Sequence, residues 1–126
     1  MKQWTILIVS IFILIIAGCW QIKYLEKTSI YTLSDIEYVK NTANNGNFEM
    51  TKEGIKNIKN TWDNIKPVWH IFIDSNEIDG VEETIEKIKS YADEENKEEV
   101  IVNANELDRT LNYIVSKQRI KLGNIL

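Results

Sequence analysis

The first twenty residues form an almost uninterrupted apolar run, and the rest of the chain alternates apolar and charged positions at helical spacing. From Trp4 to Trp20 the only ionisable group is the Cys19 thiol. A membrane-spanning helix needs roughly 17–25 apolar residues. Trp4 and Tyr24 would lie about 30 Å apart on such a helix, which suits aromatic rings at the two bilayer interfaces. The pattern predicts a membrane anchor over residues 1–24.

The same stretch also fits the signal of a bacterial lipoprotein. Lys2 precedes an apolar core of signal length, and Ile16-Ala17-Gly18-Cys19 is similar to a lipobox, in which the cysteine is lipidated and the chain is cleaved just before it. Trp20 and the single basic residue before the core favour the uncleaved anchor. A lipoprotein signal over residues 1–18, with lipid attached at Cys19, is the alternative, and a plain cleaved signal is a third interpretation.

Both leading interpretations place residues 25–126 outside the cytoplasm, on the membrane surface. The amino terminus and Lys2 on one side of the run face Lys23 and Lys27 on the other. The charges that flank the run therefore give little preference for an orientation.

Beyond the anchor, apolar positions three and four residues apart predict helices. The first continues the anchor as a stalk and ends at the cluster 44–47, since Asn and Gly tolerate left-handed backbone. The second begins at Phe48, and Pro67 is expected to kink it or to lie in the first turn of a fresh helix. The positions on the inward stripes of these helices are Leu25, Leu33, Ile36, Val39, Ala43, Phe48, Thr51, Ile55, Ile58, Trp62 and Ile65.

Polar residues between Phe72 and Ile78 predict the start of a third helix. Asp74 is expected to cap it while Glu77 reaches back, as in a capping box. A turn over residues 93–96 then leads to a fourth helix. The inward positions of these two helices are Ile78, Val81, Ile85, Ile88, Ala92, Val100, Ala104, Leu107, Leu111 and Ile114.

An internal repeat relates the two halves of the chain beyond the anchor. A shift of 49 residues places Ile36, Val39, Ala43, Asn47, Glu49, Ile58, Trp62 and Ile65 on Ile85, Ile88, Ala92, Asn96, Glu98, Leu107, Leu111 and Ile114. The repeat predicts two helix–turn–helix units that bury their apolar stripes against each other. We expect an all-α fold, with an N-terminal transmembrane helix followed by a small antiparallel bundle of two αα-hairpins, about four helices.

Charge and cysteine content limit the function. Residues 21–126 hold 14 of the 15 basic and all 19 acidic residues, a net charge of −5, which argues against nucleic acid and against adhesion to anionic lipid. The single cysteine excludes a disulfide scaffold and a cysteine-rich zinc site. About a hundred residues suffice for one small domain.

The candidate chemical groups do not form a catalytic set. His70 is the only histidine, without a nucleophile or further metal ligands at a suitable spacing. The acidic run that starts at Asp74 fails the calcium-loop pattern, because its twelfth position is Ile85. Trp62 and Trp69 lie seven residues apart, a spacing typical of core positions but also compatible with a groove for a partner. We therefore expect no catalytic residue, metal or cofactor.

Several segments resemble domain-of-unknown-function family 4363, a group of small bacterial membrane-anchored proteins. They are the short anchor, Trp62, the central run 73–79 and the closing run 122–126. The resemblance spans essentially the whole chain and is loose outside the centre. It implies an exported helical domain held by one membrane segment, and it assigns no activity or functional residue. The Ala-Gly-Cys ending of the anchor departs from the family pattern and keeps the lipoprotein alternative open.

The sequence thus predicts a non-enzymatic interaction or accessory module at the outer face of the bacterial cytoplasmic membrane. Its expected partner is another cell-envelope protein, and its oligomeric state is left open. The alternative is a lipoprotein, lipidated at Cys19, that binds a ligand at the cell surface. The candidate partner-binding residues are Trp62, Trp69, His70, Asp74, Glu77 and Asp79.

Overall fold

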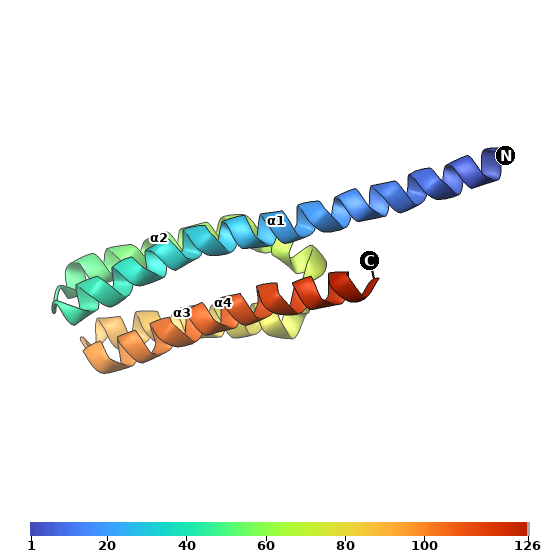
Figure 1. The fold of residues 1–126 in the computed structure, drawn as a ribbon. Coiled ribbons are helices and arrows are strands. Elements are labelled where there is room, and N and C mark those ends of the chain that lie inside the picture. Colours follow the sequence, from blue (N-terminus) through green and yellow to red (C-terminus); the bar gives the residue numbers. More distant parts are fainter. Residues whose placement is uncertain (126) are drawn as a thin grey trace.

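The computed structural model describes residues 1–125 as four helices joined by short turns (Figure 1). They are α1 (Lys2–Asn44), α2 (Phe48–Phe72), α3 (Ser75–Asp93) and α4 (Lys97–Ile125). Each helix packs against its two neighbours in an up-and-down bundle, with α4 closing the bundle against α1. The predicted all-α class and the two αα-hairpins are confirmed.

Helix α1 extends well beyond the bundle at its amino-terminal end (Figure 1). Its side chains up to Ala17 are exposed, and burial begins at Gly18. This helix is long and apolar enough to cross a membrane. It runs without a break from the apolar segment to Asn44, so the predicted continuous stalk is confirmed. The stalk is itself one of the four bundle helices, because Leu25, Ile36 and Val39 are fully buried.

The predicted stripes form most of the core, to which Ile73 and Val115 add. Of the inward positions expected from the spacing, all are buried except Leu33 and Phe48, which are partly buried. A polar pair also lies inside. The hydroxyl groups of Thr42 and Thr51 are 2.9 Å apart, which joins the two helices of the first hairpin close to their turn.

Trp62 and Trp69 form the largest part of this core. Their side chains are 1% and 0% exposed, and the rings meet edge to face with centroids 5.6 Å apart. Both indole N–H groups are satisfied: Trp69 donates to Thr28 Oγ1 at 2.8 Å and Trp62 to a carboxylate oxygen of Glu82 at 3.3 Å. The interpretation of both residues as core is confirmed.

The two hairpin turns share one backbone conformation, which confirms the 49-residue repeat. Asn45 and Glu94 adopt nearly identical angles (φ −82°, ψ 0° and φ −82°, ψ −2°). Gly46 and Glu95, one residue later, both take positive φ, at 76° and 56°. In each turn an asparagine side chain then caps the following helix: Asn47 Oδ1 accepts from the N–H of Met50 at 3.2 Å, and Asn96 Oδ1 from that of Glu99 at 3.3 Å.

The second turn therefore carries a strained residue where the first has glycine. Replacing Glu95 with glycine is expected to raise the free energy of unfolding by about 1 kcal/mol, because a side chain in the left-handed region costs about 1–2 kcal/mol and glycine gives back part of this as chain entropy. Urea unfolding in detergent, followed by circular dichroism, measures the change. The matched control is Glu94→Gly, which should destabilise the protein because Glu94 has right-handed helical angles. Equal destabilisation by both variants would contradict the assignment.

Pro67 does not interrupt the second helix. It lies inside α2, which continues to Phe72, so the prediction of a fresh helix at this point is wrong. The proline removes one donor from the helix, but Trp69 and Phe72 beyond it keep the inward spacing and hold the last turns against the core. Packing therefore outweighs the local cost of the proline.

The predicted capping box at the start of α3 is also wrong. Asp74 occupies the N-cap position, but its side chain makes no cap hydrogen bond. The Glu77 carboxylate instead accepts a hydrogen bond from Lys117 Nζ of α4 at 2.7 Å. A charged partner on a neighbouring helix is a stronger attraction than a single backbone N–H at the helix start.

Candidate functional site

Three ion pairs cross the seam between α2 and α3, where the two hairpins meet. Lys52 faces Asp93 at 4.0 Å, Lys59 faces Glu86 at 3.5 Å, and Lys66 faces Glu82. The lysines lie seven residues apart on α2, and every acidic partner is on α3. Because most of these side chains are half exposed, the pairs contribute little to stability individually and can exchange partners. Together, three basic groups on α2 opposite three acidic groups on α3 favour this register of the two hairpins.

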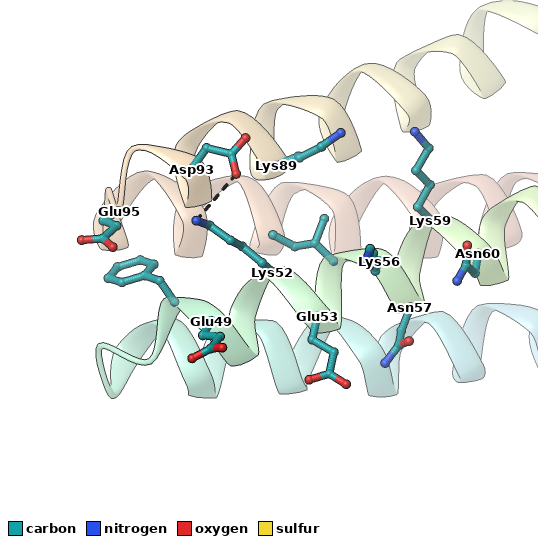
Figure 2. Close-up of a pocket in the computed structure, with 12 residues that line it drawn as sticks. Glu49, Lys52, Glu53, Lys56, Asn57, Lys59, Asn60, Lys89, Asp93 and Glu95 are labelled. Carbon is teal, nitrogen blue, oxygen red and sulfur yellow. Dashed lines mark ion pairs between the residues drawn. The ribbon is translucent and has the colours of Figure 1, made fainter.

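The seam opens into a groove toward the end of the bundle that carries the hairpin turns. We call it the α2–α3 groove. It has a volume of about 1000 Å³, and Phe48 and Ile55 form the apolar part of its lining. Figure 2 shows Lys52 reaching across from α2 to Asp93 on α3, while Glu53 and Asn57 point to the opposite side of α2. The charged residues of the lining are Lys52, Lys56, Lys59, Lys89, Glu49, Glu53, Asp93 and Glu95.

A smaller depression of about 240 Å³ continues the groove along the same seam and shares Lys59 with it. An edge of Trp62 lines it, beside Glu82. The hydrogen bond from the Lys66 ammonium, supported by that from the Trp62 indole, holds the pKa of Glu82 below its ordinary value, although burial opposes this. The same hydrogen bond with Glu82 raises the pKa of Lys66. Both groups therefore favour their charged forms and pair as ions, not as a proton donor and acceptor.

The structure divides the six predicted partner-binding residues between two places. The rings of Trp62 and Trp69 lie in the core, so the hypothesis of an exposed groove formed by these two rings is wrong. The other four lie at the α2–α3 corner, at the opposite end of the bundle from the hairpin turns. His70, Asp74 and Asp79 are exposed there, and Glu77 is half-buried against Lys117, whose pKa it raises through their hydrogen bond.

Cys19 lies where α1 enters the bundle, and its thiol is exposed. Its neighbour Gly18 is buried against α4: a Cβ at this position would come within 2.8 Å of Leu122 Cδ1. A side chain at this position would therefore require the Leu122 side chain to shift. The lipobox-like tetrapeptide is thus also a packing position in the bundle.

Sequence reasoning missed the charged seam. The sequence does contain lysines seven residues apart, at 52, 59 and 66. Their acidic partners could be assigned only once the alignment of α3 along α2 was known. Over residues 1–125, no group of three or more His, Cys, Asp or Glu side chains is placed to hold a metal ion. The chemistry available in the α2–α3 groove is charge pairing and apolar contact, which suits a protein surface.

Comparison with known proteins identifies a family and nothing further. The profile of a domain of unknown function, DUF4363, matches residues 19–125, which covers the bundle from Cys19 onward and leaves out residues 1–18. Neither a curated protein nor a solved structure matches the chain.

Proposed function

Because the chain belongs to the DUF4363 family, which is described only as a domain of unknown function, we propose a role from its own geometry: a membrane-anchored interaction module without enzymatic activity. The observation that carries this proposal is the continuity of α1. One helix runs from an exposed apolar segment directly into the buried core, so the segment and the bundle are one rigid piece (Figure 1). Exposed apolar side chains over residues 4–16 would be costly in water and are stable in lipid.

The uncleaved anchor is supported by the packing at the end of the apolar run. Cleavage before Cys19 would remove Gly18, which is buried against Leu122. It would also leave Cys19 only two residues from Gln21, whose side-chain amide donates to Gln118 of α4 at 3.2 Å. A lipid-linked amino terminus with so short a connection would have to fray the first turn of the bundle. We propose that the bundle lies at the outer face of the bacterial cytoplasmic membrane, held by residues 1–24.

The proposed contact surface for a protein partner is the α2–α3 groove. Its apolar lining at Phe48 and Ile55 is flanked by both signs of charge, a pattern that suits a helix from another envelope protein with charged flanks and an apolar stripe. Lys56 and Lys89 contribute basic groups to the lining in addition to the Lys52 pair. The acidic and basic groups of the groove form exposed ion pairs and are not arranged as a general acid and a general base. This favours a binding surface over a catalytic site.

Site-specific crosslinking in the native membrane tests this surface. A photo-crosslinking residue placed at Lys56 or at Lys89 is expected to capture the same envelope protein. The matched control is Arg109, an exposed basic position on α4, which is not part of the groove. Reversing the charge with Lys52→Glu and Lys59→Glu together should abolish capture at Lys56. Equal capture at Arg109, or capture that survives the charge reversal, would contradict the proposal.

The second candidate is a lipoprotein anchored through Cys19 that binds a ligand at the cell surface. It is favoured by the exposure of the Cys19 thiol at the point where the apolar run ends. Replacement of Cys19 with serine separates the two: a spanning anchor keeps its membrane attachment, whereas a lipoprotein loses its lipid.

A further inference from the structure

The end of α4 and the α2–α3 corner both reach the level at which the apolar run of α1 ends. The last turns of α4 pack beside its end, since Leu122 covers Gly18 and Gln118 accepts from Gln21. The α2–α3 corner reaches the same level. The ring of Trp20 stacks on Tyr24 with centroids 5.4 Å apart and meets Phe72, the last residue of α2, edge to face at 6.5 Å.

Three large apolar side chains are exposed at this end of the bundle. Ile71 at the corner is 73% exposed, Ile120 on α4 is 65% exposed, and Trp20 on α1 is 54% exposed. They come from three different helices and gather around the point where the apolar run enters the bundle. We call this the membrane-facing end, comprising Trp20, Ile71, Phe72, Ile120 and Leu122.

The length of a spanning helix fixes where this end lies. A hydrocarbon core of about 30 Å takes up about 20 residues of helix, which from Trp4 extends to Tyr24. Gly18 lies six residues before that limit, about 9 Å inside it. Because Leu122 packs on Gly18, the end of α4 lies at the same depth. The rigid continuation of α1 therefore does not allow the bundle to stand clear of the bilayer.

We propose that the membrane-facing end lies in the membrane interface, so that its exposed apolar side chains, Ile71 and Ile120, enter the lipid beside α1. This inference rests on the proposed membrane anchoring. The aromatic group of Trp20, Tyr24 and Phe72 lies at the interface, where such rings are favoured. The long side chains of Lys23 and Lys121 extend from the same level to the headgroups. Asp74 and Asp79 are exposed at the same corner, so the insertion is shallow and leaves these carboxylates among the headgroups.

The insertion defines how the protein presents its surface. Three contacts with the lipid fix the tilt of the bundle, which a single spanning helix would leave free. From Tyr24 to Asn44 the helix rises about 30 Å. The hairpin turns and the α2–α3 groove therefore lie at the end of the bundle that is farthest from the membrane. The groove is thus held at a set height above the membrane.

Fluorescence quenching by lipids tests the insertion in the full chain. In a Cys19→Ser background, single cysteines carry a polarity-sensitive fluorophore at Ile120 and at Ile71. Matched controls on the same helices are Val102 and Met50, exposed apolar residues near the hairpin turns. The protein is reconstituted into phosphatidylcholine–phosphatidylglycerol vesicles that contain nitroxide lipids, labelled at a shallow or at a deep position of the acyl chain. A label at Leu14 reports on the anchor itself.

The expected result is loss of most of the emission at positions 120 and 71 with the shallow quencher, loss at position 14 with the deep one, and no loss at 102 or 50. If position 14 is quenched while 120 and 71 behave like 102 and 50, the insertion is disproved and the membrane anchor stands. If position 14 is not quenched by either lipid, the anchor itself is disproved, and the insertion with it.

Discussion

Replacing Trp69 with alanine is expected to lower the free energy of unfolding by about 3–5 kcal/mol, the range for a fully buried aromatic side chain. The ring is completely buried, contacts the edge of Trp62 and donates a hydrogen bond to Thr28. Its removal opens a cavity between α1 and α2 and takes one partner from the Thr28 hydroxyl. Because each kcal/mol corresponds to roughly 4–8 °C in a domain of this size, the melting temperature should fall by more than about 10 °C.

The matched control is Trp4→Ala, which removes the same side chain from a position that is 71% exposed. In detergent it should leave the melting temperature of the bundle unchanged, as followed by circular dichroism. Trp69→Phe should fall between the two, because it keeps one aromatic ring but loses the pyrrole ring and its N–H. Similar melting temperatures for Trp69→Ala and Trp4→Ala would show that the Trp62–Trp69 pair is not the centre of the core.

Removing residues 1–18 is expected to transfer the protein completely from the membrane fraction to the soluble fraction. Each Leu, Ile, Phe or Val at the centre of a spanning helix favours insertion by about 0.3–0.6 kcal/mol, and residues 6–16 are mostly of these types. The bundle should remain folded, because its buried hydrophobic core begins at Leu25. Carbonate extraction and circular dichroism measure the two properties.

The control for this deletion keeps the composition and changes the order. A chain with residues 6–16 shuffled has the same hydrophobicity and should stay in the membrane, since spanning depends on apolar length and not on a particular sequence. Persistence of the shortened chain in the membrane fraction after carbonate would mean that something other than α1 attaches the protein.

The parts of the fold that repeat along the sequence could be predicted from it. The three-four spacing around Ile36, Ile58, Ile85 and Leu107 specifies helices and their inward faces, because burial of a stripe depends on the period alone. The match of Asn47 with Asn96 in the repeat predicts that the two hairpin turns are alike. In the structure both side chains cap the following helix in the same way.

The errors occur where a distant partner overrides a local preference. Local spacing places Glu77 in a capping box. In the structure it pairs instead with Lys117, which lies forty residues later on another helix. Pro67 carries a local cost that the burial of Trp69 offsets. The α2–α3 groove depends on which acids of α3 meet the lysines of α2. None of these outcomes follows from spacing, since each needs the register of one helix on another.

The membrane-facing end could not be predicted from the sequence either. Ile71 and Ile120 are 49 residues apart and, taken alone, are ordinary exposed side chains. Only the fold brings both to the level of Trp20. There the proposed contact with the bilayer accounts for the exposure of both side chains.

The intact mass of the protein extracted from its native membrane tests the central claim most directly, since the membrane anchor and the insertion both depend on a continuous α1. An uncleaved anchor predicts a mass that includes residues 1–18, close to the 14.7 kDa of the whole chain. A mass that begins at Cys19 with an added lipid would contradict it. The bundle would then be held by acyl chains at its first turn, and the spanning helix would not exist in the mature protein.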